Sequence, residues 1–353
     1  MSASPSSNLL RHALLILLLV GFVVLVTRQF TDFTSLVRTA SRAKWQWLVV
    51  AIGLHGVYLF AYALLYGKCF SIVGVAVPTR SLLANYFASI FINAVAPLGG
   101  AGSAALFIDD AVSRRQSGAR TAAGVLLTLI LDLVTALPFI GYGVVYLAQK
   151  GDLALYDVVA VAAFAIFIGL LIAVLALSYA NVRLTRRVFR SLGSIAVLFG
   201  RIFHRPGFER GKWAIENASQ FSRAARGIAS APGKLLFASL VGLVLHVVNL
   251  AGLCALFVAF EQAIKPGVVL AGFGLSIVYF VVTILEGVGV VEYVMTLVFA
   301  LGGVPRPSAI AITLAYRGLN FWIPLLIGLV FVSRAPAFHG DPGADAEREA
   351  DLG

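Results

Sequence analysis

Apolar residues run through this chain in long segments that are separated by short polar ones. A helix needs about 20 apolar residues to cross the hydrocarbon core of a bilayer. Segments of that length predict six spanning helices, at about residues 10–30, 45–66, 119–148, 156–180, 235–260 and 308–334. No small-x-small cleavage site follows the first of them, so we expect an uncleaved first helix and not a signal peptide.

Two further apolar regions, 81–112 and 268–304, are each interrupted by a cluster of glycines. Each is followed by a short turn and then by a helix with a central charged residue and a proline, at similar spacing. Two similar units with broken helices are typical of transporters built from inverted repeats. We therefore predict two re-entrant helical hairpins, with repeat cores at 81–148 and 268–334.

The composition agrees with a membrane protein. Hydrophobic residues make up 60% of the chain, charged residues 12%, and the mean hydropathy is +0.95. These values exclude an ordinary soluble domain and a disordered chain. The fold class is therefore an all-α polytopic membrane protein, with residues 1–334 as one transmembrane domain and an acidic, disordered tail at 335–353.

The charge is strongly basic, with 27 Lys and Arg against 16 Asp and Glu. Most of the basic residues fall on one side when the N-terminus is placed in the cytoplasm, so we expect both termini to be cytoplasmic, in the cytoplasmic (inner) membrane. The basic segment 181–234 reads as a helical cytoplasmic connector attracted to anionic lipid headgroups. It contains no nucleic-acid-binding module, and we expect no nucleic-acid partner.

The two glycine clusters are candidate anion sites. A helix that restarts inside the membrane has free N–H groups and a partial positive charge at its N-terminus. Such a helix end is suited to binding a phosphate or a carboxylate. The alternative is that the glycines only permit close packing of helices. The substrate-binding candidates of this kind are Pro97, Gly99, Gly100, Gly102, Gly287 and Gly289.

Asp132 and Arg317 lie near the middle of their predicted spans. A charge at that depth costs roughly 2.5 to 3.5 kcal/mol on insertion scales, so each needs a partner or a water-filled cavity. One interpretation is a structural ion pair between the two. The other is an anion site at Arg317, with Asp132 holding or releasing the anion through protonation.

Three more polar residues flank the breaks. Glu286 and Glu292 stand on either side of the second glycine turn, where Glu292 could cap the restarting helix. Otherwise either glutamate could exchange a proton or meet a positive group on a substrate. Asn93 precedes the first break and could bond freed backbone carbonyls or contact a ligand.

Motifs for catalysis and for cofactors are missing from the sequence. The five histidines are scattered, and the two cysteines, Cys69 and Cys254, are far apart, so neither set has metal-ligand spacing. There is also no nucleophile motif and no nucleotide-binding loop. We therefore expect no cofactor, no bound metal and no ATP-driven transport.

At its polar motifs the chain resembles the lysylphosphatidylglycerol synthase transmembrane-region family, whose members are also described as flippase-like. The resemblance is carried by NAVAPLGGAG at 93–102, LILDLV at 129–134, EGVGVVE at 286–292 and LAYRGLNFWIPLLIG at 314–328. It implies a membrane protein that handles lipids. It also matches the family's asparagine, glutamate and arginine to Asn93, Glu292 and Arg317.

The resemblance implies an ATP-independent translocator that moves an anionic phospholipid or a polyprenyl-linked lipid between leaflets. Full-length synthases carry an aminoacyl-transferase domain after their membrane region, and the residues after Arg334 are too few for one, so we do not expect an enzyme. Two alternatives stay open. One is a lipid-modifying transferase with Asp132 as its base, and the other is a scaffold that binds a partner enzyme through 181–234.

Overall fold

The computed structural model describes residue 39 and residues 41–95, 101–187, 210–283 and 287–334, and the regular structure of these residues is helical. Five helical segments are long and apolar enough to cross a membrane: α3 Trp45–Ile72, α6 Gly118–Lys150, α7 Leu155–Ala180, α10 Pro232–Ala259, and the segment Arg306–Phe331. The protein is therefore a multi-pass helical membrane protein. These five confirm the corresponding predicted spans, and the predicted span at 10–30 lies outside the described residues.

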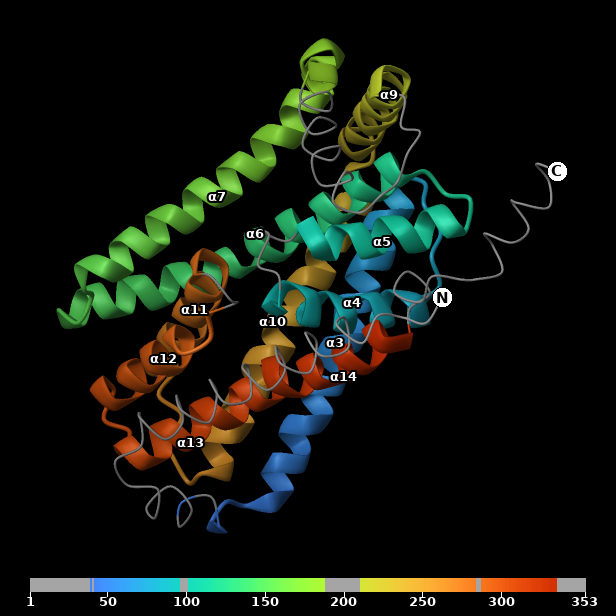
Figure 1. Ribbon diagram of the computed structural model, residues 1–353. Helices are drawn as coiled ribbons and strands as arrows, with labels where there is room; N and C mark the ends of the chain where they lie inside the picture. Colours follow the sequence, from blue (N-terminus) through green and yellow to red (C-terminus); the bar gives the residue numbers. More distant parts are fainter. Residues whose placement is uncertain (1–38, 40, 96–100, 188–209, 284–286, 335–353) are drawn as a thin grey trace. The chain divides into compact units, whose positions relative to one another are not determined.

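Shorter apolar helices occupy the regions where the sequence predicts broken hairpins. In the first region, α4 Thr79–Val95 packs against α5 Ala101–Ser113. In the second, α11 Pro266–Val282 packs against α12 Val290–Leu301 (Figure 1). Each region therefore consists of two short helices that lie against each other.

The last apolar segment is not a uniform α-helix. It consists of α13 Arg306–Arg317, a π-helical turn at Gly318–Trp322 and α14 Ile323–Arg334. Pro324 lacks the amide hydrogen that an α-helix would use to bond Asn320, and the wider turn lies directly before this proline. The apolar pattern predicts this segment as one span and gives no sign of the π turn.

The order of helix lengths occurs twice along the chain. The first run is α3, α4, α5 and α6, with 28, 17, 13 and 33 residues. The second run begins with α10, α11 and α12, with 28, 17 and 12 residues, and continues into the segment of α13 and α14. A long helix, two short helices and another long helix thus follow one another in both halves.

The chain divides into two compact units. The first unit comprises Met1–His55, Ala136–Phe164 and Val248–Gly318, and the second comprises the remaining residues. In the first unit the backbones of α6 and α11 approach closely through glycines. A Cβ at Gly143 would lie 2.8 Å from the Cα of Ala271, and one at Gly274 would lie 2.9 Å from the Cα of Ile140. Small residues permit this kind of helix contact in membranes.

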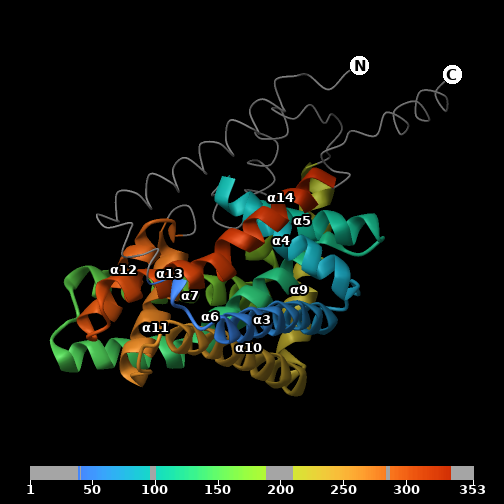
Figure 2. The ribbon, with the colours of Figure 1, turned by 90° about the horizontal axis from the view of Figure 1, so that it is seen from below.

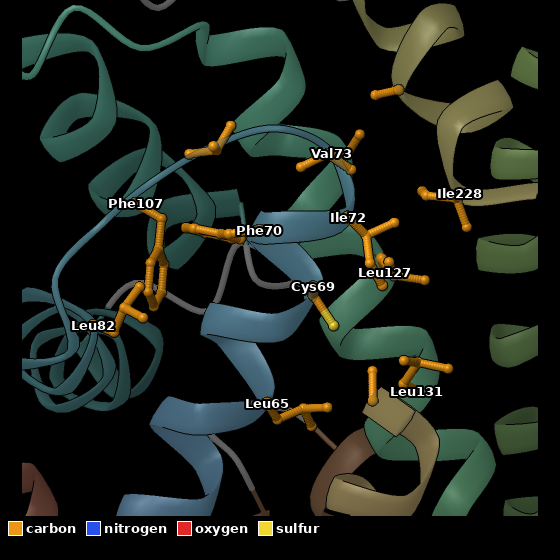
Figure 3. Packing of buried hydrophobic residues seen from close by; sticks show 14 of the residues in the cluster. Leu65, Cys69, Phe70, Ile72, Val73, Leu82, Phe107, Leu127, Leu131 and Ile228 are labelled. Atoms are coloured by element: carbon orange, nitrogen blue, oxygen red, sulfur yellow. The ribbon is translucent and has the colours of Figure 1, made fainter. Parts of the chain in front are cut away.

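The second unit has a core built from α3, α4, α5, α6, α9 and α10, of which α9 spans Arg210–Ala229 (Figure 3). Leu65, Phe70 and Leu127 are almost fully buried in it. The ring of Phe107 from α5 stacks on Tyr66 of α3 at a centroid distance of 4.5 Å. Ile228 of α9 completes the cluster, so the predicted connector at 181–234 contains a helix that packs on the transmembrane helices.

Also in the second unit, α14 lies directly against α4, and both views show the two helices side by side (Figures 1 and 2). Phe331 stacks on Phe87 with ring planes 6° apart. Gly328 faces the backbone carbonyl of Phe87 so closely that a Cβ at residue 328 would overlap this carbonyl. The absence of a side chain at Gly328 therefore sets the distance between the two helices.

We expect Gly328→Ala to destabilise the protein by about 1 to 3 kcal/mol, the range seen when extra methyl groups are forced into packed cores. Thermal unfolding of the purified protein in detergent measures the effect. Gly56→Ala is the matched control, because a Cβ at Gly56 meets nothing within 4 Å. Equal melting temperatures for the two variants would show that the α4–α14 contact does not limit stability.

Candidate functional site

The first unit contains a buried ion pair. Arg317 is the last residue of α13 and Glu292 is the third residue of α12, and both side chains are less than 5% exposed. The Nε atom of Arg317 donates to Oε1 of Glu292 at 2.8 Å. A guanidinium and a carboxylate in this geometry form a charge-assisted hydrogen bond, which offsets part of the cost of burying both charges.

The same carboxylate caps a helix. The other oxygen of Glu292, Oε2, accepts a hydrogen bond of 2.7 Å from the backbone N–H of Gly289, the N-cap residue of α12. The sequence analysis left open whether Glu292 caps the helix or serves a substrate site. In the structure it caps α12 and also holds Arg317, so one side chain joins the glycine turn to the buried arginine.

The glycines of this turn are required by its backbone. Gly287 and Gly289 have φ angles of 72° and 85°, a region that side-chain-bearing residues rarely adopt. A Cβ at Gly287 would in addition collide with Val291 and lie 3.3 Å from the Cα of Phe280. This turn therefore places the amide of Gly289 beside Glu292.

Arg317 is bordered by polar groups and by the change in helix type. Tyr316 is buried and hydrogen-bonds to Ser276 of α11 and Asn249 of α10. The π turn at Gly318–Trp322 begins directly after Arg317. Single π turns inside α-helices are frequent at functional sites.

The second unit contains a separate polar cluster around Asp132 of α6. The hydroxyl of Tyr62 on α3 donates to Asp132 Oδ2 at 3.0 Å. His246 of α10 places Nε2 at 2.9 Å from the backbone carbonyl of Asp132 and at 3.4 Å from Oδ1. Because a carbonyl oxygen can only accept, Nε2 carries the hydrogen.

Packing brings this histidine to the aspartate. Gly242 lies one turn before His246 on the same face of α10, and a Cβ there would lie 2.8 Å from Oγ1 of Thr135. Thr135 itself donates to the carbonyls of Leu131 and Asp132. The close contact between α10 and α6 therefore lets a buried imidazole reach the acidic residue.

Aromatic rings pack against Tyr62, the residue whose hydroxyl group bonds Asp132. Tyr62 lies 4.5 Å from Tyr86 and 5.6 Å from Tyr66, measured between ring centroids. The carboxylate of Asp132 is 17% exposed and that of Glu292 is 3% exposed. Asp132 is thus the more accessible of the two acidic groups.

Four of the predicted site residues come together in the first unit: Arg317, Glu292, Gly287 and Gly289. The ion pair of Arg317 is made with Glu292, while Asp132 contacts Tyr62 and His246. Each charge therefore has a partner within its own unit.

The predicted site at the first break is only partly visible. Pro97, Gly99, Gly100 and Glu286 lie outside the described residues. Gly102 is the second residue of α5, and a Cβ there would come within 2.7 Å of Ile92 on α4, which favours the packing interpretation. The Oδ1 atom of Asn93 is buried and has no hydrogen-bond partner among the described residues.

Two residues of the Asp132 cluster, Tyr62 and His246, were absent from the sequence-based candidates. The histidines were set aside because they lack metal-ligand spacing, and no metal-binding group of three occurs among the described residues. The available signal was different: His246 stands within LVLHVVN, and an ionisable residue in an apolar span indicates a partner or a function.

Replacing Arg317 by Met leaves the buried carboxylate of Glu292 without a counter-ion, and we expect a loss of about 3 to 5 kcal/mol. The double variant Arg317→Met/Glu292→Gln removes both charges and keeps an oxygen for the amide of Gly289, so most of the loss should be recovered. Thermal unfolding measures both. Arg306→Met, at the exposed start of the same helix, is the control. If the double variant lost as much stability as the two single variants together, Arg317 and Glu292 would not be coupled.

Comparison with known proteins identifies the family of this membrane protein. A search of curated proteins gives no significant match. The model of the family described as the lysylphosphatidylglycerol synthase transmembrane region matches residues 12–328, which include both polar clusters. The chain therefore belongs to the lysylphosphatidylglycerol synthase transmembrane-region family.

Proposed function

We propose that this protein is an ATP-independent lipid translocator that moves a phospholipid, or a lipid-linked anionic headgroup, between the leaflets of the cytoplasmic membrane. Family membership supports a role in lipid handling. The observation that carries the proposal further is the buried pair of Arg317 and Glu292 beside the glycine turn at Gly287–Gly289. A buried arginine in a membrane helix is a natural site for a phosphate.

Exchange of counter-ions explains how a headgroup could enter and leave. A phosphate offers oxygens that match the fork of a guanidinium. When the phosphate replaces Glu292 as the partner of Arg317, Glu292 keeps its hydrogen bond to the amide of Gly289. This bond stabilises the released carboxylate. Arg317 is thereby paired before, during and after the passage of the headgroup, and no step leaves its charge isolated.

Asp132 and His246 supply a second function in this proposal. An imidazole and a carboxylate within 3.4 Å can share or exchange a proton. The pair could couple lipid movement to a proton gradient. It could also bind a positive group of the headgroup, a role for which Glu286 and Glu292 are further candidates.

The repeated order of helix lengths supports an alternating-access mechanism. Helices of 12 to 17 residues extend about 18 to 26 Å, less than the roughly 30 Å of the hydrocarbon core. We infer that the pairs α4–α5 and α11–α12 are re-entrant hairpins that enter from opposite sides. Rocking of two inverted repeats would then expose the headgroup site to each leaflet in turn, with both termini in the cytoplasm.

The decisive experiment reconstitutes the purified protein in liposomes that contain fluorescent lipids with anionic, zwitterionic or polyprenyl-phosphate headgroups. Loss of outer-leaflet fluorescence to a membrane-impermeant quencher follows the movement. We expect headgroup-dependent movement that falls at least about tenfold in Arg317→Met/Glu292→Gln, equivalent to about 1.4 kcal/mol or more. Arg306→Met should keep normal rates.

Unchanged rates in the folded double variant would overturn the assignment of Arg317 to the headgroup site. No movement of any lipid by folded wild-type protein would instead favour a scaffold for a partner enzyme. Product formation from a donor and a lipid acceptor would favour a transferase.

The proton-coupling role makes a separate prediction. A pH gradient across the liposome should change the wild-type rate and should have no effect on Asp132→Asn, because this variant cannot exchange a proton at residue 132. Asp109→Asn is the matched control, since Asp109 is an exposed acidic residue of the same unit. If Asp132→Asn kept a full response to the gradient, the proton would have to be carried by another group.

A further inference from the structure

A small cavity lies in the second unit, apart from the Asp132 cluster, where the end of α3 meets the start of α10. Its volume is about 270 Å³, and it is lined by Lys68, Ser71, Gly233, Lys234 and Phe237. This volume is slightly below the range of roughly 300 to 1,000 Å³ that is typical of pockets for drug-sized ligands. The cavity is therefore of a size for a small polar group and not for a large organic ligand.

Two lysines and no acidic residue line the cavity. Lys68 lies over the ring of Phe237, with Nζ 5.0 Å from the ring centroid, so a cation–π contact holds it at the cavity wall. Neither Lys68 nor Lys234 forms an ion pair within the part of the chain that the structure describes. The cavity thus has an excess of positive charge.

The start of α10 adds hydrogen-bond donors to this charge. Pro232 is the first residue of the helix, and the backbone amides of Gly233 and Lys234 fall in the first turn, where no intrahelical acceptor exists. Ala231, which precedes the helix, has no side-chain oxygen that could cap them. Nothing lies within 4 Å of the position that a Cβ would take at Gly233, so this part of the backbone is open to a ligand.

The surface next to the cavity is apolar. On α10, Leu236 and Leu240 are more than half exposed and Phe237 is 49% exposed, and Leu64 of α3 is exposed on the same unit. Exposed side chains of this kind on a spanning helix face lipid acyl chains. An anion bound here would therefore have its charged part in the cavity and hydrocarbon beside it.

We propose that this cavity binds the phosphate group of an anionic phospholipid, at a site distinct from the translocation site. Lys68 and Lys234 neutralise the phosphate, the amides of Gly233 and Lys234 are its hydrogen-bond donors, and the acyl chains lie along α10. Exposed Arg223 and Arg226 on α9, shortly before α10, add to the attraction for anionic headgroups. Such a lipid would fasten the start of α10 to the end of α3.

The test uses the full chain in a neutral detergent and measures thermal stabilisation during titration with short-chain phosphatidylglycerol, short-chain phosphatidylcholine or inorganic phosphate. We expect stabilisation by phosphatidylglycerol at concentrations where the other two have little effect. Lys68→Gln/Lys234→Gln should weaken the apparent affinity about 25-fold, at roughly fivefold for each lysine near an anionic headgroup. Lys68→Arg/Lys234→Arg should retain binding.

The matched control is Arg80→Gln/Lys150→Gln, which removes two exposed cations elsewhere and should bind like the wild type. Equal binding by the Lys68→Gln/Lys234→Gln variant and the wild type would overturn the site. If inorganic phosphate stabilised the protein as much as phosphatidylglycerol does, the site would bind free phosphate and not specifically a lipid. Because the readout is binding and not movement of lipid, the result is independent of the translocation assay.

Discussion

Burying an arginine within a membrane protein forces the surrounding structure to supply a negative charge, and the arrangement around Arg317 follows from that constraint. The counter-charge comes from Glu292, which is itself buried and needs donors for both of its oxygens. Arg317 donates a hydrogen bond to one oxygen, and the amide of Gly289 donates a hydrogen bond to the other. The amide is available only because the chain turns through positive φ angles at Gly287 and Gly289. The ion pair, the turn and the start of α12 are thus one connected structure.

The long helices could be predicted because the thickness of a bilayer imposes a minimum length on each apolar segment. The second glycine turn was also predictable, since few residues other than glycine tolerate its backbone, and the position of Glu292 in the first helical turn made a cap one of the two interpretations of this residue. The partner of Asp132 was not predictable. Tyr62 and His246 are 70 and 114 positions away from it, and their approach depends on how α3, α6 and α10 pack. That packing depends in turn on Gly242, whose role no local pattern reveals.

The two polar clusters differ in a way that suits separate tasks. The first unit holds a permanent cation, because a guanidinium does not lose its proton in proteins. The second unit holds an imidazole and a carboxylate, two groups that can gain or lose a proton. In the proposed translocator the guanidinium would hold the anion and the second pair would carry the proton. The sequence analysis considered Asp132 and Arg317 as partners of each other, whereas the structure gives each charge a partner of its own.

The two hydrogen bonds of Glu292 also mean that its partners can be lost separately or together. Removal of the Arg317 side chain takes one bond from Glu292 and leaves its hydrogen bond to the Gly289 amide in place. Removal of the Glu292 side chain takes away the partner of Arg317 and the cap of α12 together. The first change keeps the start of the helix capped and the second does not. The integrity of a helix start is therefore tied to one member of a buried ion pair and not to the other.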